Sequence, residues 1–123
     1  KRILCYHPTV TSMHVCVHFT QIVASPESTA TNSPEGIHQD GMDYIVSALV
    51  IDRENVSGGK SVIFSENNAC KILFETTLRP GYGIFQPDKD TDLWHVVEPI
   101  TASDKTKSAF RSTIGFDFEL KEL

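Results

Sequence analysis

Near its end the chain reads Ala109-Phe110-Arg111-Ser112-Thr113-Ile114-Gly115-Phe116-Asp117-Phe118-Glu119-Leu120. The large apolar side chains of this stretch all have even numbers, and most polar ones have odd numbers. Because successive side chains of a strand point to opposite faces, this period of two predicts a β-strand over residues 109–120.

A second alternating stretch covers residues 13–24. Met13, Val15, Val17 and Phe19 fall on one face, and the other face carries His14, Cys16 and His18. Histidine and cysteine are zinc ligands, but zinc sites rarely take three ligands from one flat strand, and the usual paired cysteines are missing. We therefore interpret this stretch as a strand with one apolar and one polar face.

Short strand-like segments separated by turns fill the rest of the chain. Residues 25–36 are predicted to be a loop, residues 55–59, 66–68 and 79–83 turns, and residues 100–108 a polar connection. Further strands are predicted at residues 43–52, 61–65, 70–78, 84–85 and 93–99, with Tyr44, Val46 and Ala48 lining one side of the first. Without a long helix or an internal repeat, this pattern predicts an all-β domain, most simply a double-sheet jelly roll.

Composition limits the function classes. The 123 residues suffice for one domain, and a net charge of −5 without a basic patch argues against nucleic-acid and anionic-membrane partners. No apolar run is long enough to span a membrane, and no signal peptide is recognised. The cysteines are Cys5, Cys16 and Cys70, an odd and sparse set that favours a reducing compartment, and we expect a cytoplasmic location.

One motif points to metal chemistry. The segment Pro34-Glu35-Gly36-Ile37-His38-Gln39-Asp40-Gly41 places a histidine and an aspartate two residues apart, on one face if the backbone is extended. His95, in Trp94-His95-Val96, offers a third ligand. Two histidines and one carboxylate with open positions are typical of non-haem Fe(II) oxygenases, whereas a lone His-x-Asp pair is often a surface feature.

Five segments, in this order, resemble the 2-oxoglutarate-Fe(II) dioxygenase family that includes bacterial free L-amino-acid hydroxylases such as isoleucine 4-hydroxylase. They are the segment 34–41, Arg53-Glu54-Asn55-Val56-Ser57-Gly58-Gly59-Lys60-Ser61, Leu78-Arg79-Pro80-Gly81, Trp94-His95-Val96-Val97-Glu98-Pro99-Ile100 and Phe110-Arg111-Ser112-Thr113. The resemblance covers residues 20–120. It implies a double-stranded β-helix, which is a distorted jelly roll with a cupin-like barrel.

The resemblance also implies the site and the reaction. His38, Asp40 and His95 would bind Fe(II), while Arg111 and Thr113 would bind the distal carboxylate of 2-oxoglutarate. With O2, the cosubstrate would be converted to succinate and CO2 while a small molecule, expected to be a free L-amino acid, is hydroxylated. Glu35 is either a contact for a substrate ammonium group or an exposed loop carboxylate, and we favour exposure. Tyr44 is either a cosubstrate contact or a packed ring.

Members of that family are usually longer, with an N-terminal portion ahead of the loop at residues 25–36. Residues 1–123 are therefore expected to be a single catalytic core, either cut from a longer protein or a compact variant. Two alternatives stay open: a non-catalytic jelly-roll binding module, and a cupin-type metalloenzyme that does not use 2-oxoglutarate. The oligomeric state, the substrate and any role of His14, His18 and the cysteines are left open by the sequence.

Overall fold

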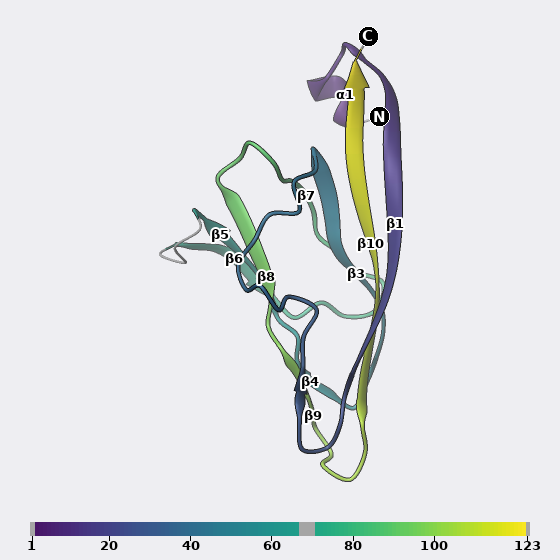
Figure 1. Cartoon of the computed structure of the whole chain (residues 1–123), viewed down its shortest axis with the longest axis vertical. Coiled ribbons are helices and arrows are strands. Elements are labelled where there is room, and N and C mark those ends of the chain that lie inside the picture. Colours follow the sequence, from purple (N-terminus) through teal and green to yellow (C-terminus); the bar gives the residue numbers. More distant parts are fainter. Residues whose placement is uncertain (1, 67–70, 123) are drawn as a thin grey trace.

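A computed structural model describes residues 2–66 and 71–122 of the chain (Figure 1). Almost all of its regular structure is β, with a single short helix among the described residues. The elements are α1 (Arg2–Tyr6), β1 (Val10–Ala24), β2 (Thr29–Ala30), β3 (Tyr44–Glu54), β4 (Val56–Gly58), β5 (Ser61–Ser65), β6 (Ile72–Thr76), β7 (Phe85–Pro87), β8 (Leu93–Val97), β9 (Ile100–Ala102) and β10 (Ala109–Glu122). No helix in the described part of the chain is long and apolar enough to cross a membrane.

The strands form antiparallel sheets in two facing layers. The larger sheet has the order β1-β10-β3-β7, and a three-stranded sheet β6-β5-β8 lies across from it, with the small sheet β2-β9-β4 at one end (Figure 1). Antiparallel strands in two packed sheets are the arrangement of a jelly roll. The predicted all-β jelly-roll fold is therefore confirmed.

The two longest strands were both predicted from their alternation. β1 and β10 pair from Val10 opposite Glu122 to Ala24 opposite Ala109, and after a shift between Val10 and Ser12 the register is continuous. The shortest strands were missed: β2 lies in the predicted loop 25–36, β9 in the predicted connection 100–108 and β4 in the predicted turn 55–59. Strands of two or three residues are too short to show a period. The predicted turn at 66–68 and the start of the segment 70–78 lie partly outside the described residues.

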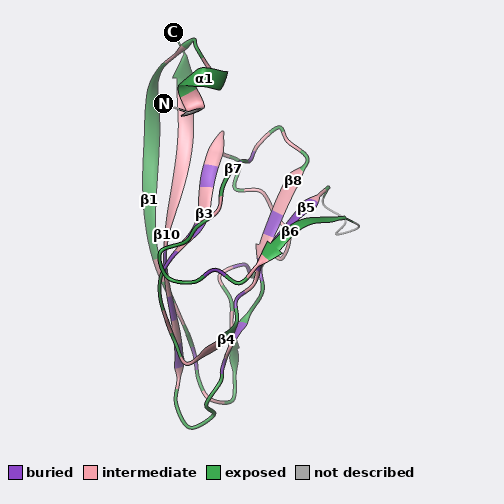
Figure 2. Cartoon of the chain, turned by 180° about the vertical axis from the view of Figure 1, so that it is seen from behind, coloured by how far each residue is buried: buried purple, intermediate pink, exposed green. Residues whose placement is uncertain are grey.

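The apolar face of β1 points away from the facing sheet. Met13, Val15, Val17 and Phe19 are all exposed, Phe19 by 76% (Figure 2). The opposite face of β1 carries His18 and Thr20 into the space between the layers. Of the polar face of this strand, His18 and Thr20 thus line the interior space, whereas His14 and Cys16 are exposed.

Two apolar clusters form part of the buried core. One contains Ala24, Ile100, Ala102 and Ala109, and the other contains Ala48, Val50 and Leu78. Residues from β1, β9 and β10 meet in the first cluster, so it ties the small sheet to the larger one.

The alternation of β3 is interrupted. Ile114 and Phe116 on β10 are two residues apart but pair with Leu49 and Val46, which are three apart, so β3 holds an extra residue there. A bulge of this kind shifts the following side chains to the other face. The buried side chains of β3 are those of Ile45, Ala48 and Val50. The expectation that Tyr44, Val46 and Ala48 share one side is therefore wrong.

Candidate metal centre

His38 and His95 are brought together by the backbone. The two residues form an isolated antiparallel bridge, in which each backbone N–H donates to the other's carbonyl oxygen, at 2.9 and 3.0 Å. His95 belongs to β8, whose other edge pairs with β5. The segment around His38 is extended only at this bridge rather than as a full strand, yet the bridge suffices to hold the two rings side by side.

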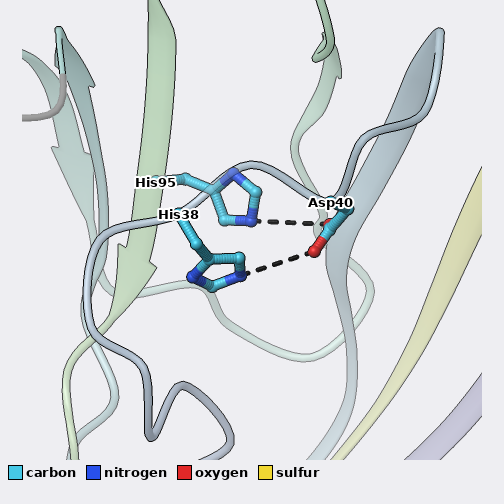
Figure 3. Close-up of side chains that lie close together, drawn as sticks. All are labelled: His38, Asp40 and His95. Atoms are coloured by element: carbon cyan, nitrogen blue, oxygen red, sulfur yellow. Dashed lines mark ion pairs between the residues drawn. The ribbon is translucent and has the colours of Figure 1, made fainter.

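Three side chains converge at this point (Figure 3). The His38 Nε2 atom lies 3.4 Å from Asp40 Oδ1, and the His95 Nε2 atom lies 3.5 Å from Asp40 Oδ2. One potential ligand atom of each residue lies within 4.8 Å of the others. Among the described residues these three form the group suited to a metal ion, and His14, Cys16 and His18 do not. The structure thus brings together the predicted ligands and leaves the polar face of β1 outside the cluster.

Neighbouring groups favour the metal-binding forms of both the imidazole and the carboxylate ligands. His38 Nδ1 donates to the carbonyl oxygen of Gly36 at 2.8 Å, which leaves the Nε2 lone pair directed at Asp40. The adjacent His95 side chain lowers the pKa of Asp40 against the opposing effect of burial, with smaller contributions from His38 and His18. A neutral imidazole nitrogen and an ionised carboxylate are the forms that bind a divalent first-row metal, so the residues fit Fe(II).

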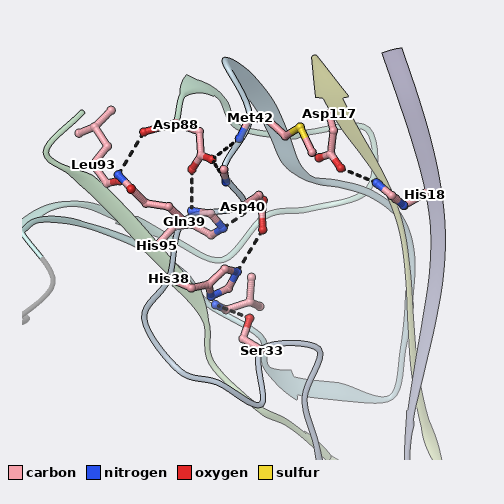
Figure 4. Close-up of polar contacts among 12 residues, drawn as sticks. His18, Ser33, His38, Gln39, Asp40, Met42, Asp88, Leu93, His95 and Asp117 are labelled. Carbon is pink, nitrogen blue, oxygen red and sulfur yellow. Dashed lines mark hydrogen bonds and ion pairs between the residues drawn. The ribbon is translucent and has the colours of Figure 1, made fainter. Parts of the chain in front are cut away.

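The cluster opens into a cavity of about 370 Å³ between the two layers. Its walls are mostly polar. The lining residues come from β1, β3, β8 and β10 and from the segment 32–40: His18, Thr20, Asn32, Ser33, His38, Asp40, Val46, Ser47, His95, Val97, Thr113, Gly115 and Asp117. On the wall opposite His95, the His18 Nε2 atom lies 2.5 Å from Asp117 Oδ2 (Figure 4). A cavity of this size accommodates a small molecule.

Arg111 lies deeper on the same strand face as Thr113. Thr113 lines the cavity, and Arg111, two residues earlier, is only 1% exposed. Its Nε and Nη2 atoms are buried and have no hydrogen-bond partner among the described residues. Burial, and secondarily the charge of Arg53, lowers the pKa of Arg111 to about 10. A buried guanidinium with unused donors is costly unless an anion pairs with it, and a carboxylate matches its geometry.

The structure adds a second arginine that the sequence did not single out. Arg53 on β3 is the direct cross-strand partner of Arg111, and its Nη1 atom is also buried without a partner among the described residues. Its Nη2 atom donates to the carbonyl oxygen of Gly58 at 2.7 Å. The only sequence signal was its place at the head of the segment 53–61, and no local pattern connects it with Arg111.

Gly59 lets the chain pass close over both arginines. It has φ +71°, and a Cβ atom there would lie 3.2 Å from Arg53 Nη1, 3.4 Å from Arg111 Cδ and 3.0 Å from a side-chain carbon of Ile100. Glycine is the residue that tolerates both this backbone conformation and this approach. The second glycine of the Gly58-Gly59 pair therefore has a packing role as well as a turn role.

Glu35 and Tyr44 were left open by the sequence. Glu35 is exposed, as favoured, with its Oε1 atom 3.4 Å from His38 Nδ1. The Tyr44 ring stacks on Phe85 with centroids 5.4 Å apart, and its hydroxyl group is 2.9 Å from His7 Nε2. Tyr44 is thus a packed ring with its hydroxyl satisfied away from the metal cluster.

Fold and side-chain cluster together define a jelly-roll protein with two histidines and one carboxylate at the mouth of a cavity. The family described as 2OG-Fe dioxygenase matches residues 3–117, and the chain belongs to this family, which uses Fe(II), 2-oxoglutarate and O2. This bears out the resemblance at the level of the family. No curated protein matches the chain.

Three solved structures share the fold. IDO from Bacillus thuringiensis superposes with a TM-score of 0.73 at 20% identity, covering 89% of this chain and 47% of that one. A BsmA homologue from Methylobium petroleophilum superposes with a TM-score of 0.68 at 22% identity, covering 87% of this chain and 41% of that one. The Fe(II)/α-ketoglutarate-dependent dioxygenase TqaL superposes with a TM-score of 0.72 at 15% identity, covering 94% of this chain and 46% of that one. The chain therefore spans about half the length of these proteins.

Proposed function

We propose that this chain binds one Fe(II) ion through His38, Asp40 and His95 and couples the oxidative decarboxylation of 2-oxoglutarate to the hydroxylation of a small molecule. The observation that carries the proposal is the convergence of these three side chains on the wall of a cavity, in a chain of the 2OG-Fe dioxygenase family. Iron with 2-oxoglutarate and O2 supplies the oxidising chemistry, and the protein supplies position and exclusion of water.

In this proposal Arg111 and Thr113 bind the distal carboxylate of 2-oxoglutarate. The buried donors of Arg111 support this role because they have no partner among the described residues. Thr113 is 5% exposed and lies between Arg111 and the cavity on one strand face, so its hydroxyl group is available to the same anion. Arg53, opposite Arg111, adds a second positive charge to this end of the site.

For the substrate we propose a free L-amino acid. Support comes from Asp117 on the cavity wall, since its carboxylate can accept from an ammonium group in addition to its contact with His18 Nε2. The size of the cavity is compatible with a molecule of this class. The sparse cysteines support a cytoplasmic location. The net charge of −5 supports a small-molecule substrate rather than nucleic acid.

The test is an anaerobic titration of the metal-free protein with Fe(II) and then 2-oxoglutarate, followed in the visible spectrum. Chelation of the metal by 2-oxoglutarate is expected to produce a weak absorption band, which Arg111→Ala should weaken and Arg79→Ala should not. Arg79 is a suitable control because it is an exposed arginine over the Tyr82 ring. Metal binding without the band would favour a cupin-type enzyme that does not use 2-oxoglutarate, and failure to bind Fe(II) would favour a non-catalytic module.

A further inference from the structure

Asp88 is a wholly buried carboxylate outside the set of three ligands. It lies in the connection between β7 and β8 and is 0% exposed. Its Oδ2 atom accepts hydrogen bonds from the backbone N–H groups of Gly41 and Met42, at 2.7 and 3.0 Å. These are the two residues that follow Asp40, so one oxygen of Asp88 holds the backbone next to a candidate metal ligand (Figure 4).

The other oxygen of Asp88 faces a second ligand. Asp88 Oδ1 lies 4.0 Å from His95 Nδ1, and both atoms are buried without a hydrogen-bond partner among the described residues. The opposite ring nitrogen, His95 Nε2, is the one directed at Asp40. The separation is longer than a hydrogen bond, as is common for catalytic contacts before ligands bind. The His95 ring thus lies between two carboxylates, one at each nitrogen.

Gln39 fixes the loop that carries Asp88. Its side-chain amide nitrogen donates to the carbonyl oxygens of Asp88, Thr91 and Leu93, at 3.1, 3.0 and 2.8 Å. The backbone N–H of Asp88 also donates to the carbonyl oxygen of Asp43, at 3.2 Å. Since Gln39 lies between His38 and Asp40 in sequence, the loop is tied to the segment that contains both ligands.

We propose that Asp88 is a positioning residue that holds His95 with its hydrogen on Nδ1 and couples this ring to the Asp40 segment. The inference rests on the proposed metal-binding function. A neutral imidazole that gives its Nε2 lone pair to a metal must carry its hydrogen on Nδ1. An ionised carboxylate only accepts hydrogen bonds, so at Nδ1 it favours that tautomer and fixes the ring.

The test compares Asp88→Asn with the matched variant Asp43→Asn. An asparagine at position 88 can keep its oxygen on the Gly41 and Met42 N–H groups, which turns its NH2 group toward His95 Nδ1 and favours the wrong tautomer. Asp43 is a suitable control because its carboxylate also accepts a backbone N–H, from Leu120 at 2.7 Å, but contacts Lys89 rather than a ligand ring.

The probe is Co(II), whose visible spectrum reports both affinity and ligand geometry. Loss of an outer partner of a ligating histidine weakens metal binding by about 10–100-fold. We expect Asp88→Asn to raise the Co(II) dissociation constant by about that factor and to alter the spectrum, while Asp43→Asn leaves both unchanged. Equal affinities for Asp88→Asn and wild type would overturn the role of Asp88, as would equal losses in the two variants.

A second measurement needs no variant. In the wild-type protein loaded with diamagnetic Zn(II), the 1H and 15N shifts of the His95 ring report whether Nδ1 carries the hydrogen and whether that hydrogen is hydrogen-bonded, and the proposal requires both. An Nδ1 without a hydrogen, or with one that is not hydrogen-bonded, would overturn it even if Asp88→Asn failed to fold. Failure of the wild type to bind Co(II) would instead overturn the proposed function together with this inference, so the two failures are distinguishable.

Discussion

Arg111 and Arg53 lie directly opposite one another on β10 and β3, and each carries buried donors that no described residue satisfies. Like charges opposite each other on neighbouring strands destabilise a sheet. Burial, and to a smaller extent the charge of Arg53, lowers the pKa of Arg111 to about 10. The arrangement is understandable if a dicarboxylate is bound at this end of the cavity.

The first prediction concerns the charge of Arg53. Arg53→Gln should weaken 2-oxoglutarate binding by about tenfold or more, because a hydrogen bond to a charged group contributes about 1.5–3 kcal/mol. The stability of the ligand-free protein should change by no more than about 1 kcal/mol, because removal of a like-charge pair offsets loss of the hydrogen bond from Arg53 to Gly58. Calorimetric titration and urea unfolding check both parts.

Two further variants serve as controls for Arg53. Arg53→Lys keeps the positive charge and should retain part of the affinity, while Arg79→Gln removes an exposed arginine and should change neither quantity. An Arg53→Gln protein that binds 2-oxoglutarate normally but unfolds more easily would show that Arg53 is only structural.

The second prediction concerns the metal ligands. His38→Ala should weaken Fe(II) binding by more than about 100-fold, because even loss of an outer-shell partner costs about 10–100-fold. His14→Ala is the matched control, since its side chain is 72% exposed and lies on the polar face of β1. Metal affinity is measured by competition with a chromophoric chelator. Equal affinities for the two variants would contradict the assignment of His38.

Gly59 is the subject of the third prediction. Gly59→Ala should destabilise the protein by more than about 1–2 kcal/mol, since a left-handed backbone costs a residue with a side chain roughly that amount and the new methyl group meets Ile100 and Arg53. It should also weaken 2-oxoglutarate binding, because the arginines must move. Urea unfolding and ligand titration provide the measurements.

Gly81→Ala separates the two contributions at Gly59. Gly81 has φ +89°, but a Cβ atom there would meet nothing within 4 Å. This variant should show the backbone cost alone and bind 2-oxoglutarate normally. If the two variants lose the same stability and the same affinity, the close packing of Gly59 on the arginines is not important.

The fourth prediction concerns acid stability. Burial opposes ionisation of Asp43, but the backbone N–H of Leu120 and the ammonium group of Lys89 outweigh it and lower the pKa of Asp43. A carboxyl group with a lowered folded-state pKa contributes stability above its unfolded pKa of about 3.9 and loses it as the pH falls through the folded value. Wild type should therefore be more stable than Asp43→Asn at neutral pH, and the difference should shrink below about pH 4. Urea unfolding across this range measures it; a difference independent of pH would refute the electrostatic origin.

The fifth prediction concerns the exposed face of β1. Phe19→Ser should change the free energy of unfolding by no more than about 0.5 kcal/mol, the usual range for surface substitutions, because Phe19 is 76% exposed. Ile45→Ala, at a position that is 0% exposed, should cost about 2–5 kcal/mol. A large loss for Phe19→Ser would mean that this face is covered in solution.

Much of the fold could be predicted because the alternation of apolar and polar residues that marks a strand is visible within a short stretch of sequence. The alternation in β1 and β10 gave both long strands, and the His38-x-Asp40 spacing with His95 gave the candidate ligands. Very short strands such as β2 and β9 were missed because they carry too few residues for a period. The bulge in β3 was missed because it depends on the register with β10.

Alternation and motifs along the chain are therefore enough to predict the longer strands, the all-β class and the types of ligand available. Tertiary packing is what brings His18 and Thr20 of β1 to the cavity, Arg53 opposite Arg111, and Asp88 behind His95. The physical reason is that alternation defines two faces of a strand without saying which one is covered. That choice, like each pairing of distant residues, is made by the register and stacking of sheets whose strands lie far apart in the chain.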